Sequence, residues 1–273
     1  MKNKPSVFPL YITIILVVMY IPIILVIIHS FNQSRLSSVW GGFTLSWYTE
    51  LFRDRAMFEG LRTSLILGIM ASLLAAALGT LGASGMARVR MAGTVKAAGT
   101  GAVHKAMEYL SILPIMMPEI IMGMIFLGFF SLLAIPPGLF TLVVAHTAFC
   151  IPYPYLLVRA RLAGLDKSYV EAARIMGASD IRAFYDITLP LVLPAVISGM
   201  LISFAMSFDD VIVSSFVAGV NTNTLPMIIY SRLRAGVTPK TNAMCSLLFA
   251  LTIILCLTAA FLARRRQRDG TAL

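Results

Sequence analysis

Six apolar stretches, each long enough to cross a bilayer, constrain this chain more than any other feature of its sequence. They run near Val7–Ile28, Ser64–Ala87, Tyr109–Leu132, Leu139–Val158, Leu193–Val217 and Ala243–Leu262. At a rise of about 1.5 Å per residue, a helix needs about 20 apolar residues to span a hydrocarbon core of about 30 Å. The sequence therefore predicts an all-α integral membrane protein with six transmembrane helices.

The composition excludes a water-soluble globule. Hydrophobic residues make up 59% of the 273 residues and charged residues only 12%, whereas an ordinary soluble domain has about 25% charged residues. The chain therefore has too little polar surface to cover an apolar interior in water. Cys150, Cys245 and Cys256 each lie in an apolar run without metal-binding spacing, which favours packing over a metal or disulfide role.

The charge distribution indicates how the chain crosses the membrane. Lys and Arg in short loops stay on the cytoplasmic side, and most of the 22 basic residues fall inside if both termini are cytoplasmic. The basic segment with Arg232, Arg234 and Lys240 strains this orientation, because it then lies outside. The run Arg264–Arg268 is read as a topology anchor, with nucleic-acid binding a remote alternative.

The polar stretch Phe31–Glu59 is the nearest feature to a domain boundary. It predicts an N-terminal part, residues 1–60, with one transmembrane helix and an extracytoplasmic loop. Residues 61–273 then form a five-helix core that carries a cytoplasmic loop over residues 159–190.

Local signals in that cytoplasmic loop predict two short helices joined by a turn. Ser168 and Glu171 have the spacing of a capping box, and Gly177 suits the left-handed residue that ends a helix. Ser179 and Asp180 then start a second helix, which we expect to stop near Pro190.

The same loop resembles the EAA loop of bacterial ABC importer permeases. The matching positions are Glu171, Ala172, Ala173, Gly177, Asp180, Ile187, Leu189 and Pro190. The resemblance implies the MetI-like permease architecture and a loop that couples to a cytoplasmic ATPase dimer, where ATP and Mg²⁺ would bind. It also implies a second permease subunit, in a heterodimer, and an extracytoplasmic substrate-binding protein. A capped surface helix without a partner is the alternative.

Outside the loop, four more segments are similar to the permeases of spermidine/putrescine importers, and among them to the C-type subunit. These segments are Trp40–Tyr48, Met117–Ile120, Phe208–Phe216 and Leu225–Tyr230. The resemblance implies a bacterial inner-membrane protein that carries polyamines, with an opine or another small cation as the alternative cargo. An ion-coupled secondary carrier is a further alternative, although such a carrier has no use for a coupling loop.

The sequence carries no sign of its own energy source or of hydrolytic chemistry. The Gly-x-x-x-x-Gly-Lys phosphate cradle is absent, as are the Gly-x-Ser-x-Gly and His-Glu-x-x-His patterns. We therefore expect a transport subunit that is not an enzyme and holds no cofactor itself.

Three acids, Glu119, Asp209 and Asp210, lie inside the apolar stretches. An ionised side chain at bilayer depth costs about 2.5–3.5 kcal/mol on insertion scales, and all Lys and Arg residues lie in loops or at span edges. We therefore expect these acids to face an external cation in a substrate pathway. The alternative is that the Asp pair breaks or caps the helix, or that burial keeps the acids neutral.

Helical spacing distinguishes the two aspartates. Ser203, Ser207, Asp210 and Ser214 form one polar stripe, which predicts that Asp210 and Ser207 face the pathway. Asp209 lies on another face, and we expect it to meet a partner subunit or cap the backbone. The same reasoning interprets His146 as a hydrogen-bonded contact between helices.

Aromatic residues are the last candidates for the substrate pathway. Tyr20 and Trp47 are candidates to offer aromatic faces to an amine. Anchoring at the membrane interface is the alternative for both.

Overall fold

The computed structural model describes residues 7–35, 39–91, 100–166 and 168–270, and it describes side chains over a slightly narrower range. The described chain is helical, with one isolated β-bridge between Asn32 and Phe43. It forms two compact units, one made of Met1–Met57 with Ile229–Leu273 and the other of Phe58–Ile228. The division at residue 60 that the sequence suggests stays a prediction.

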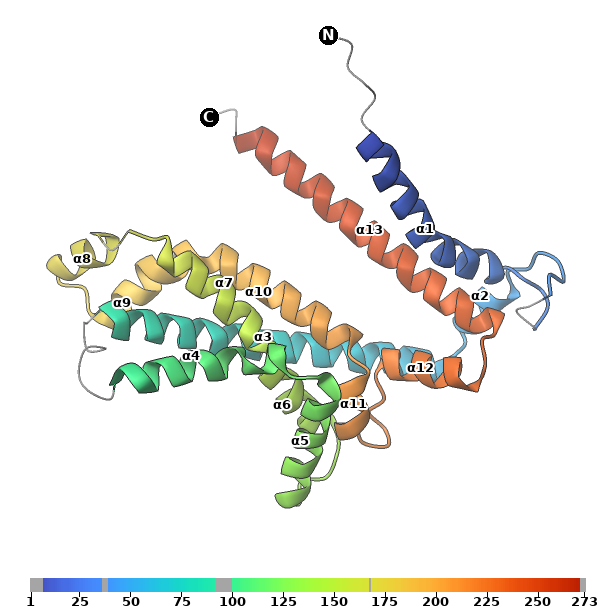
Figure 1. The fold of residues 1–273 in the computed structure, drawn as a ribbon, viewed down its shortest axis with the longest axis horizontal. Helices are drawn as coiled ribbons and strands as arrows, with labels where there is room; N and C mark the ends of the chain where they lie inside the picture. The colour runs from blue at the N-terminus through green and yellow to red at the C-terminus, as the bar shows by residue number, and fades with distance from the viewer. Residues whose placement is uncertain (1–6, 36–38, 92–99, 167, 271–273) are drawn as a thin grey trace, which may run out of the picture. The chain divides into compact units, whose positions relative to one another are not determined.

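The first unit contains α1 (Val7–His29), α2 (Ser46–Leu51) and α13 (Pro239–Gly270), and α13 packs against both other helices (Figure 1). A buried asparagine, Asn32, organises the loop between α1 and α2. Its side-chain amide donates to Val39 O at 2.7 Å, and its Oδ1 accepts from Gly41 N at 2.8 Å. Satisfying these buried polar groups gives the polar stretch a defined conformation.

The second unit holds the other helices, and α3 and α12 each carry the chain from one unit into the other. Its elements are α3 (Arg55–Met91), α4 (Thr100–Met116), α5 (Glu119–Leu132), α6 (Leu139–Cys150), α7 (Pro152–Ala163), α8 (Ser168–Ile175), α9 (Asp180–Ala183), a π-helical turn (Phe184–Thr188), α10 (Leu189–Asp209), α11 (Ile212–Val217) and α12 (Leu225–Ala235).

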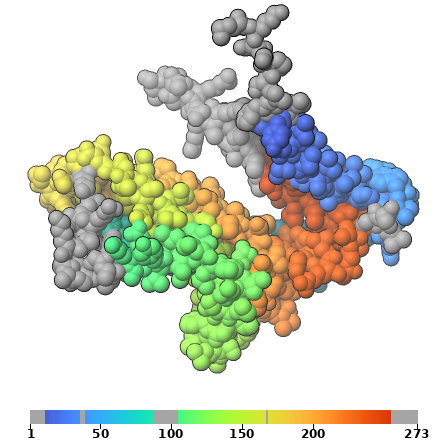
Figure 2. Space-filling model, viewed as in Figure 1, coloured from blue at the N-terminus to red at the C-terminus, as the bar shows by residue number. Residues whose placement is uncertain are grey.

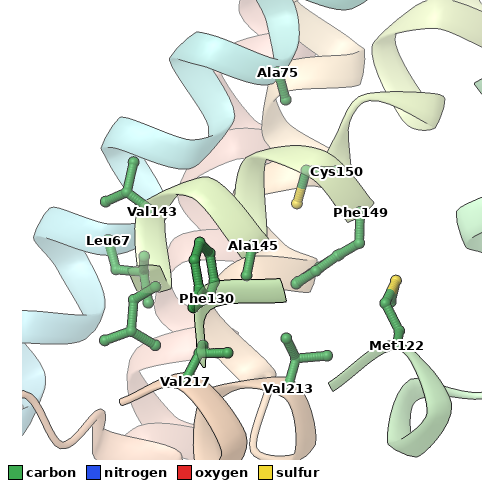
Figure 3. Packing of buried hydrophobic residues seen from close by; sticks show 11 residues of the cluster. Leu67, Ala75, Met122, Phe130, Val143, Ala145, Phe149, Cys150, Val213 and Val217 are labelled. Atoms are coloured by element: carbon green, nitrogen blue, oxygen red, sulfur yellow. The ribbon is translucent and has the colours of Figure 1, made fainter. Parts of the chain in front are cut away.

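Small residues on α3 and α10 bring the helices of this unit close together. A Cβ at Gly79 would lie 2.9 Å from Tyr155 N, and a Cβ at Gly199 would clash with Pro154, so α7 packs against the backbones of α3 and α10. Close approach through small residues is how membrane helices gain packing contacts. A buried core that includes Leu67, Phe130 and Val217 joins α3, α5, α6 and α11 (Figure 3).

The structure confirms the all-helical membrane class. Four helices are long and apolar enough to cross a membrane: Tyr11–His29, Arg55–Ala87, Leu139–Ala163 and Asp180–Asp209. A fifth span results if α4 and α5 count as one span with a bend of 111° between them. The described apolar part of α13, Pro239–Ile254, is shorter, so the number six stays a prediction.

One predicted stretch, Leu193–Val217, is wrong as a continuous span. Helix α10 ends at Asp209, Asp210 adopts an extended conformation with φ −65° and ψ 131°, and α11 begins only at Ile212. Hydropathy alone does not reveal this break, because apolar residues continue on both sides of it. The break nevertheless lies at the two acids that the sequence singles out.

Candidate functional site

A cavity of about 370 Å³ in the second unit brings together the three acids predicted for the pathway. Glu119, Asp209 and Asp210 all line it, together with apolar residues of α4, α5, α6 and α10 and with Tyr153 of α7. Neither Lys nor Arg lines this cavity among the described residues. The structure thus collects acidic side chains from separate helices around a cavity that no described Lys or Arg lines.

Two helix interruptions place acids at this cavity. Pro118 has no N–H to donate, so α4 ends at Met116 and α5 restarts at Glu119 after the sharp bend. Figure 1 shows α5 turning away from α4, and in Figure 2 the light-green surface of α5 projects beyond that of α4. The second interruption is the break at Asp210 and Val211. Backbone leaves helical geometry at membrane depth mainly where it lines a cavity or is buried in protein.

Asp210 also caps a helix. Its Oδ2 accepts from Ser214 N at 2.7 Å and its Oδ1 from Val213 N at 3.2 Å, and only 5% of its side chain is exposed. The alternative of a capping aspartate therefore holds for Asp210, whereas the sequence suggested Asp209 for this role. Asp209 is exposed and lines the cavity. A pathway role for either residue stays a prediction.

The serines of the polar stripe pack against α6 and do not line the cavity, whereas Asp210 of the same stripe does. Ser207 Oγ lies 2.8 Å from His146 Nδ1, and Ser203 Oγ donates to Cys150 O at 3.2 Å. Ser207 is buried and is not among the cavity-lining residues. The interpretation of His146 as a hydrogen-bonded helix contact agrees with this geometry.

Sequence reasoning missed two contacts of that histidine. His146 Nε2 lies 3.0 Å from Ser214 Oγ and 3.5 Å from Asp210 Oδ2. The signal was present in the spacing of Ser207, Asp210 and Ser214, but nothing in the sequence tied that stripe to α6.

The aromatic candidates lie in the first unit, whereas the acids lie in the second. Trp47 is buried and its Nε1 donates to Asn32 O at 2.7 Å, so it holds the loop after α1. Tyr20 lies on α1 and is half exposed. The described contacts of Trp47 favour a structural role, and the pathway role of both residues stays a prediction.

The loop over residues 159–190 forms the predicted helix, turn and helix. Gly177 has φ +86°, its N–H donates to Arg174 O at 2.9 Å, and Ala178 N donates to Ala173 O at 2.9 Å. These two bonds make the Schellman end of α8 that the glycine predicts. Ser179 Oγ accepts from Arg182 N at 3.3 Å and so caps α9, as predicted.

Two details of the loop differ from the prediction. Ser168 was expected to cap the N-terminus of the first short helix, but it is the first residue of α8 itself. Asp166 caps this end instead, because its Oδ1 accepts from Ser168 N at 3.0 Å. The second helix does not stop at Pro190 but continues through the π-helical turn into α10. A proline removes one intrahelical hydrogen bond and crowds the preceding turn, and the wider π turn just before it accommodates this.

The residues of α8 and α9 divide into a packed set and an exposed set. Ala173 and Ala183 are buried, while Glu171 lines a cavity of about 220 Å³ beneath α8. Ile175 and Met176 at the end of α8 are 87% and 82% exposed. An apolar helix end left open in this way is typical of a protein interaction site.

One aspartate of the first unit pairs with two of the three cations in the basic segment that strained the predicted orientation. Asp54 Oδ2 lies 2.9 Å from Arg232 Nη2 and 3.0 Å from Lys240 Nζ. Burial by itself would raise the pKa of Asp54, but hydrogen bonds from Lys240 and from Met57 N, with the charge of Arg232, lower it below 3.8. Arg234 stacks on Tyr230, with its guanidinium carbon 4.7 Å from the ring centre.

Relatives of known sequence match nearly the whole chain. The spermidine/putrescine transport system permease protein PotC of Haemophilus influenzae is 36% identical, covering 91% of this chain and 93% of its own. The putrescine transport system permease protein PotI of Escherichia coli is 36% identical, covering 92% of this chain and 88% of its own.

Solved structures share the fold at low sequence identity. A bacterial ABC transporter involved in the import of the acidic polysaccharide alginate aligns with a TM-score of 0.68 at 13% identity, over 96% of this chain and 98% of its own. The MetNI methionine ABC transporter aligns with a TM-score of 0.59 at 18% identity, over 80% of this chain and 95% of its own.

These comparisons confirm the predicted MetI-like permease architecture and the resemblance read from the EAA loop. The relatives are transport permeases, so the chain is a multi-pass transport subunit and not an enzyme. The family model described as "binding-protein-dependent transport system inner membrane component" matches residues 91–268, and the chain therefore belongs to that family of permeases.

Proposed function

We propose that this chain is a permease subunit of an ATP-driven importer that moves polyamines, spermidine or putrescine, into the cytoplasm. One observation carries the proposal: Glu119, Asp209 and Asp210 line one cavity that has neither Lys nor Arg among its described lining residues. Polyamines carry several ammonium groups, and such a cavity supplies the opposite charge. The names of the relatives, which specify spermidine and putrescine, support the same cargo.

The strength of such an interaction suits transport. An ammonium and a carboxylate about 4 Å apart interact by about 4 kcal/mol at an effective dielectric of about 20. Desolvation of both charges offsets much of that energy. The remainder is enough to select a cation and small enough to release it on the other side. An opine or another small cation is the second candidate cargo and would use the same acids.

The proposed complex contains a second permease subunit, in a heterodimer, a cytoplasmic ATPase dimer with ATP and Mg²⁺, and an extracytoplasmic binding protein. The family description supports dependence on a binding protein. Glu119 and Asp209 are exposed on this chain, so the second permease is expected to complete the pathway around them. This chain is proposed to bind no cofactor.

The cargo assignment is tested by deleting charge without changing shape. Asp210→Asn keeps a side chain that caps a helix well, so it separates the charge of Asp210 from its capping role. We expect Asp210→Asn and Glu119→Gln each to lower binding-protein-dependent uptake about tenfold, with a larger loss for spermidine than for putrescine. Normal uptake by both variants at matched abundance would refute the cation site, as would transport of only neutral or anionic solutes.

The loop with α8 and α9 is proposed to dock on the ATPase. The exposed Ile175 and Met176 supply an apolar contact, and Gly177 fixes the turn. Gly177→Val forces a β-branched residue into a left-handed conformation, and Glu171→Lys reverses a charge at the same helix. Both should uncouple ATP hydrolysis from uptake. The matched control is Gly164→Val, because Gly164 has φ −92° in the same segment. Equal uptake by all three variants would refute the coupling role.

Both termini are proposed to be cytoplasmic in a bacterial inner membrane. The distribution of Lys and Arg supports this orientation, because most of the 22 basic residues then lie in cytoplasmic segments. In a background without the three native cysteines, Asn223→Cys should react with an impermeant thiol reagent in intact cells. Ile175→Cys should react only after permeabilisation. The reverse pattern would overturn the orientation.

A secondary carrier would also use intramembrane acids, and one measurement separates the two classes. Proteoliposomes that hold the assembled complex should take up polyamine only when ATP is present on the side of the membrane where the ATPase subunits lie. Uptake by the purified chain alone, driven by an ion gradient, would favour the carrier.

A further inference from the structure

We propose that His146 is a positioning residue that fixes the carboxylate of Asp210 at the acidic cavity and thereby sets the affinity for the transported cation. This inference rests on the proposed function, since it takes Asp210 as part of the cation site. It assigns a role to a buried histidine that neither lines the cavity nor belongs to the coupling loop.

His146 joins the two sides of the break between α10 and α11. Its Nδ1 lies 2.8 Å from Ser207 Oγ on α10, and its Nε2 lies 3.0 Å from Ser214 Oγ on α11. A neutral imidazole has one donor and one acceptor nitrogen, and a hydroxyl can play either part. Both ring nitrogens are therefore satisfied in either tautomer, and His146 bridges the interruption from α6.

Asp210 lies between those two serines in the sequence and in the network. His146 Nε2 is 3.5 Å from Asp210 Oδ2, and the same carboxylate oxygen accepts from Ser214 N at 2.7 Å. His146, Ser207 and Ser214 are all buried, so water does not compete for these bonds. The imidazole thus holds Ser214, and Ser214 holds the carboxylate.

Local sequence does not define this break, which is why a tertiary contact is needed. The segment Asp209–Ile212 contains neither Gly nor Pro. Helix α11 has only six residues, and a helix that short is unstable by itself. Its start is held by the capping of Asp210, by the bond that Ser215 Oγ donates to Val211 O, and by the contact of Ser214 with His146, which is the one among these that comes from a distant segment. The ring of Phe149, 4.9 Å from the imidazole centre, keeps the histidine in place on α6.

Movement of the carboxylate would change cation binding without removing the charge. A hydrogen-bond network that includes a charged group typically contributes enough energy for about a tenfold change in affinity. We therefore expect His146→Phe, which keeps an aromatic ring of similar size without polar atoms, to raise the apparent KM for spermidine uptake about tenfold. The maximal rate should change less than the KM.

Two further substitutions separate the two arms of the histidine. Gln carries polar atoms near the position of Nε2, and Asn carries them near that of Nδ1. His146→Gln should therefore restore most of the affinity through Ser214, whereas His146→Asn should keep only the contact with Ser207 and bind weakly. If His146→Phe does not assemble, this pair still tests the proposal. Equal affinity of the Gln and Asn variants would overturn it.

The matched control is Thr147→Val on the same helix. Thr147 is buried, and its hydroxyl has no hydrogen-bond partner among the described residues. Val has nearly the same shape, so this variant should transport with the KM of the parent protein. A rise in KM equal to that of His146→Phe would indicate a general packing effect on α6 and would overturn the proposal.

A double-mutant cycle completes the test and separates it from the proposed function. Uptake KM is measured in the assembled complex for His146→Phe, Asp210→Asn and both together, and for His146→Phe with Glu119→Gln. If His146 acts through Asp210, the first pair is strongly non-additive and the second pair is additive within error. Additivity in the first pair overturns the positioning role. Normal uptake by Asp210→Asn alone would instead refute the cation site.

Discussion

Two groups of carboxylates in this protein have opposite surroundings. Asp54 in the first unit lies within 3.0 Å of both Arg232 and Lys240. Glu119, Asp209 and Asp210 in the second unit share a cavity without a described Lys or Arg. A carboxylate that is paired inside the chain stabilises the fold, whereas one that lacks such a partner is available to a cation from outside. The contrast supports a structural role for the first group and the proposed transport role for the second.

The largest effect is expected from giving the acidic cavity a cation of its own. Ile115 lines the cavity beside Glu119, so Ile115→Lys should place an ammonium where we propose that the polyamine binds. The ammonium of this lysine is part of the chain, so it competes with the polyamine for the three acids at every polyamine concentration. We therefore expect uptake to fall about a hundredfold. Uptake of radiolabelled spermidine by the assembled complex measures this, with Ile115→Gln as the neutral control. Equal losses in the two variants would make the cavity ordinary packing space.

The next effect concerns the paired group. Asp54→Asn should lower the free energy of unfolding by about 2 kcal/mol, between the values typical of exposed and of fully buried ion pairs. Two cations then lose their common partner. Thermal unfolding in detergent measures the loss, and the KM for uptake should remain that of the parent protein. Glu50→Gln, on the exposed surface of α2, is the control. A change in KM without a change in stability would reverse the roles assigned to the two groups.

The pH dependence of stability sharpens the same point. The pKa of Asp54 is lowered in the folded protein, while an unfolded Asp has a pKa of about 3.9. The pairing therefore stabilises the fold above about pH 4 and is lost as the pH falls through the lower, folded pKa. The difference in melting temperature between the parent and Asp54→Asn should shrink between about pH 6 and pH 3. A difference that stays constant over this range would exclude an ionic role for Asp54.

The smallest effect is expected from removing one cation at a time. Arg232→Gln or Lys240→Gln leaves Asp54 with its other partner, so each should cost about 1 kcal/mol or less. The double variant should cost more than the sum, because Asp54 is then left without either partner. Chemical or thermal denaturation of the three variants measures this. Simple additivity would show that the two cations act independently of Asp54.

The loop with α8 and α9 shows how much local structure can be predicted from the sequence. Gly177 ends α8 in the left-handed conformation, and Ser179 caps α9, as their residue types require. Such contacts lie within a few residues of each other, so sequence spacing reveals them. The prediction failed at Pro190, where a π-helical turn lets the helix continue. Proline indicates a strained turn, but only packing decides whether the helix stops or widens.

The acidic cavity shows the opposite case. Hydropathy and charge singled out Glu119, Asp209 and Asp210, yet Ser207 of the same polar stripe, which was expected to face the pathway, contacts α6. A helical stripe specifies which residues share a face but not what that face meets. The sequence offered a break at the Asp pair only as an alternative, because the residues of α6 that contact this region lie far away in the sequence.

The sequence by itself determined the membrane class, the permease family, the end of α8 at Gly177 and the start of α9 at Ser179. These depend on composition, on runs of apolar residues and on contacts between near neighbours. Only the tertiary structure decided which carboxylates are paired and which are open. Asp54 pairs with Arg232, which lies far from it in the sequence, and His146 on α6 contacts Asp210 at the end of α10. A charge is visible in a sequence, but its partner is set by the packing of distant segments.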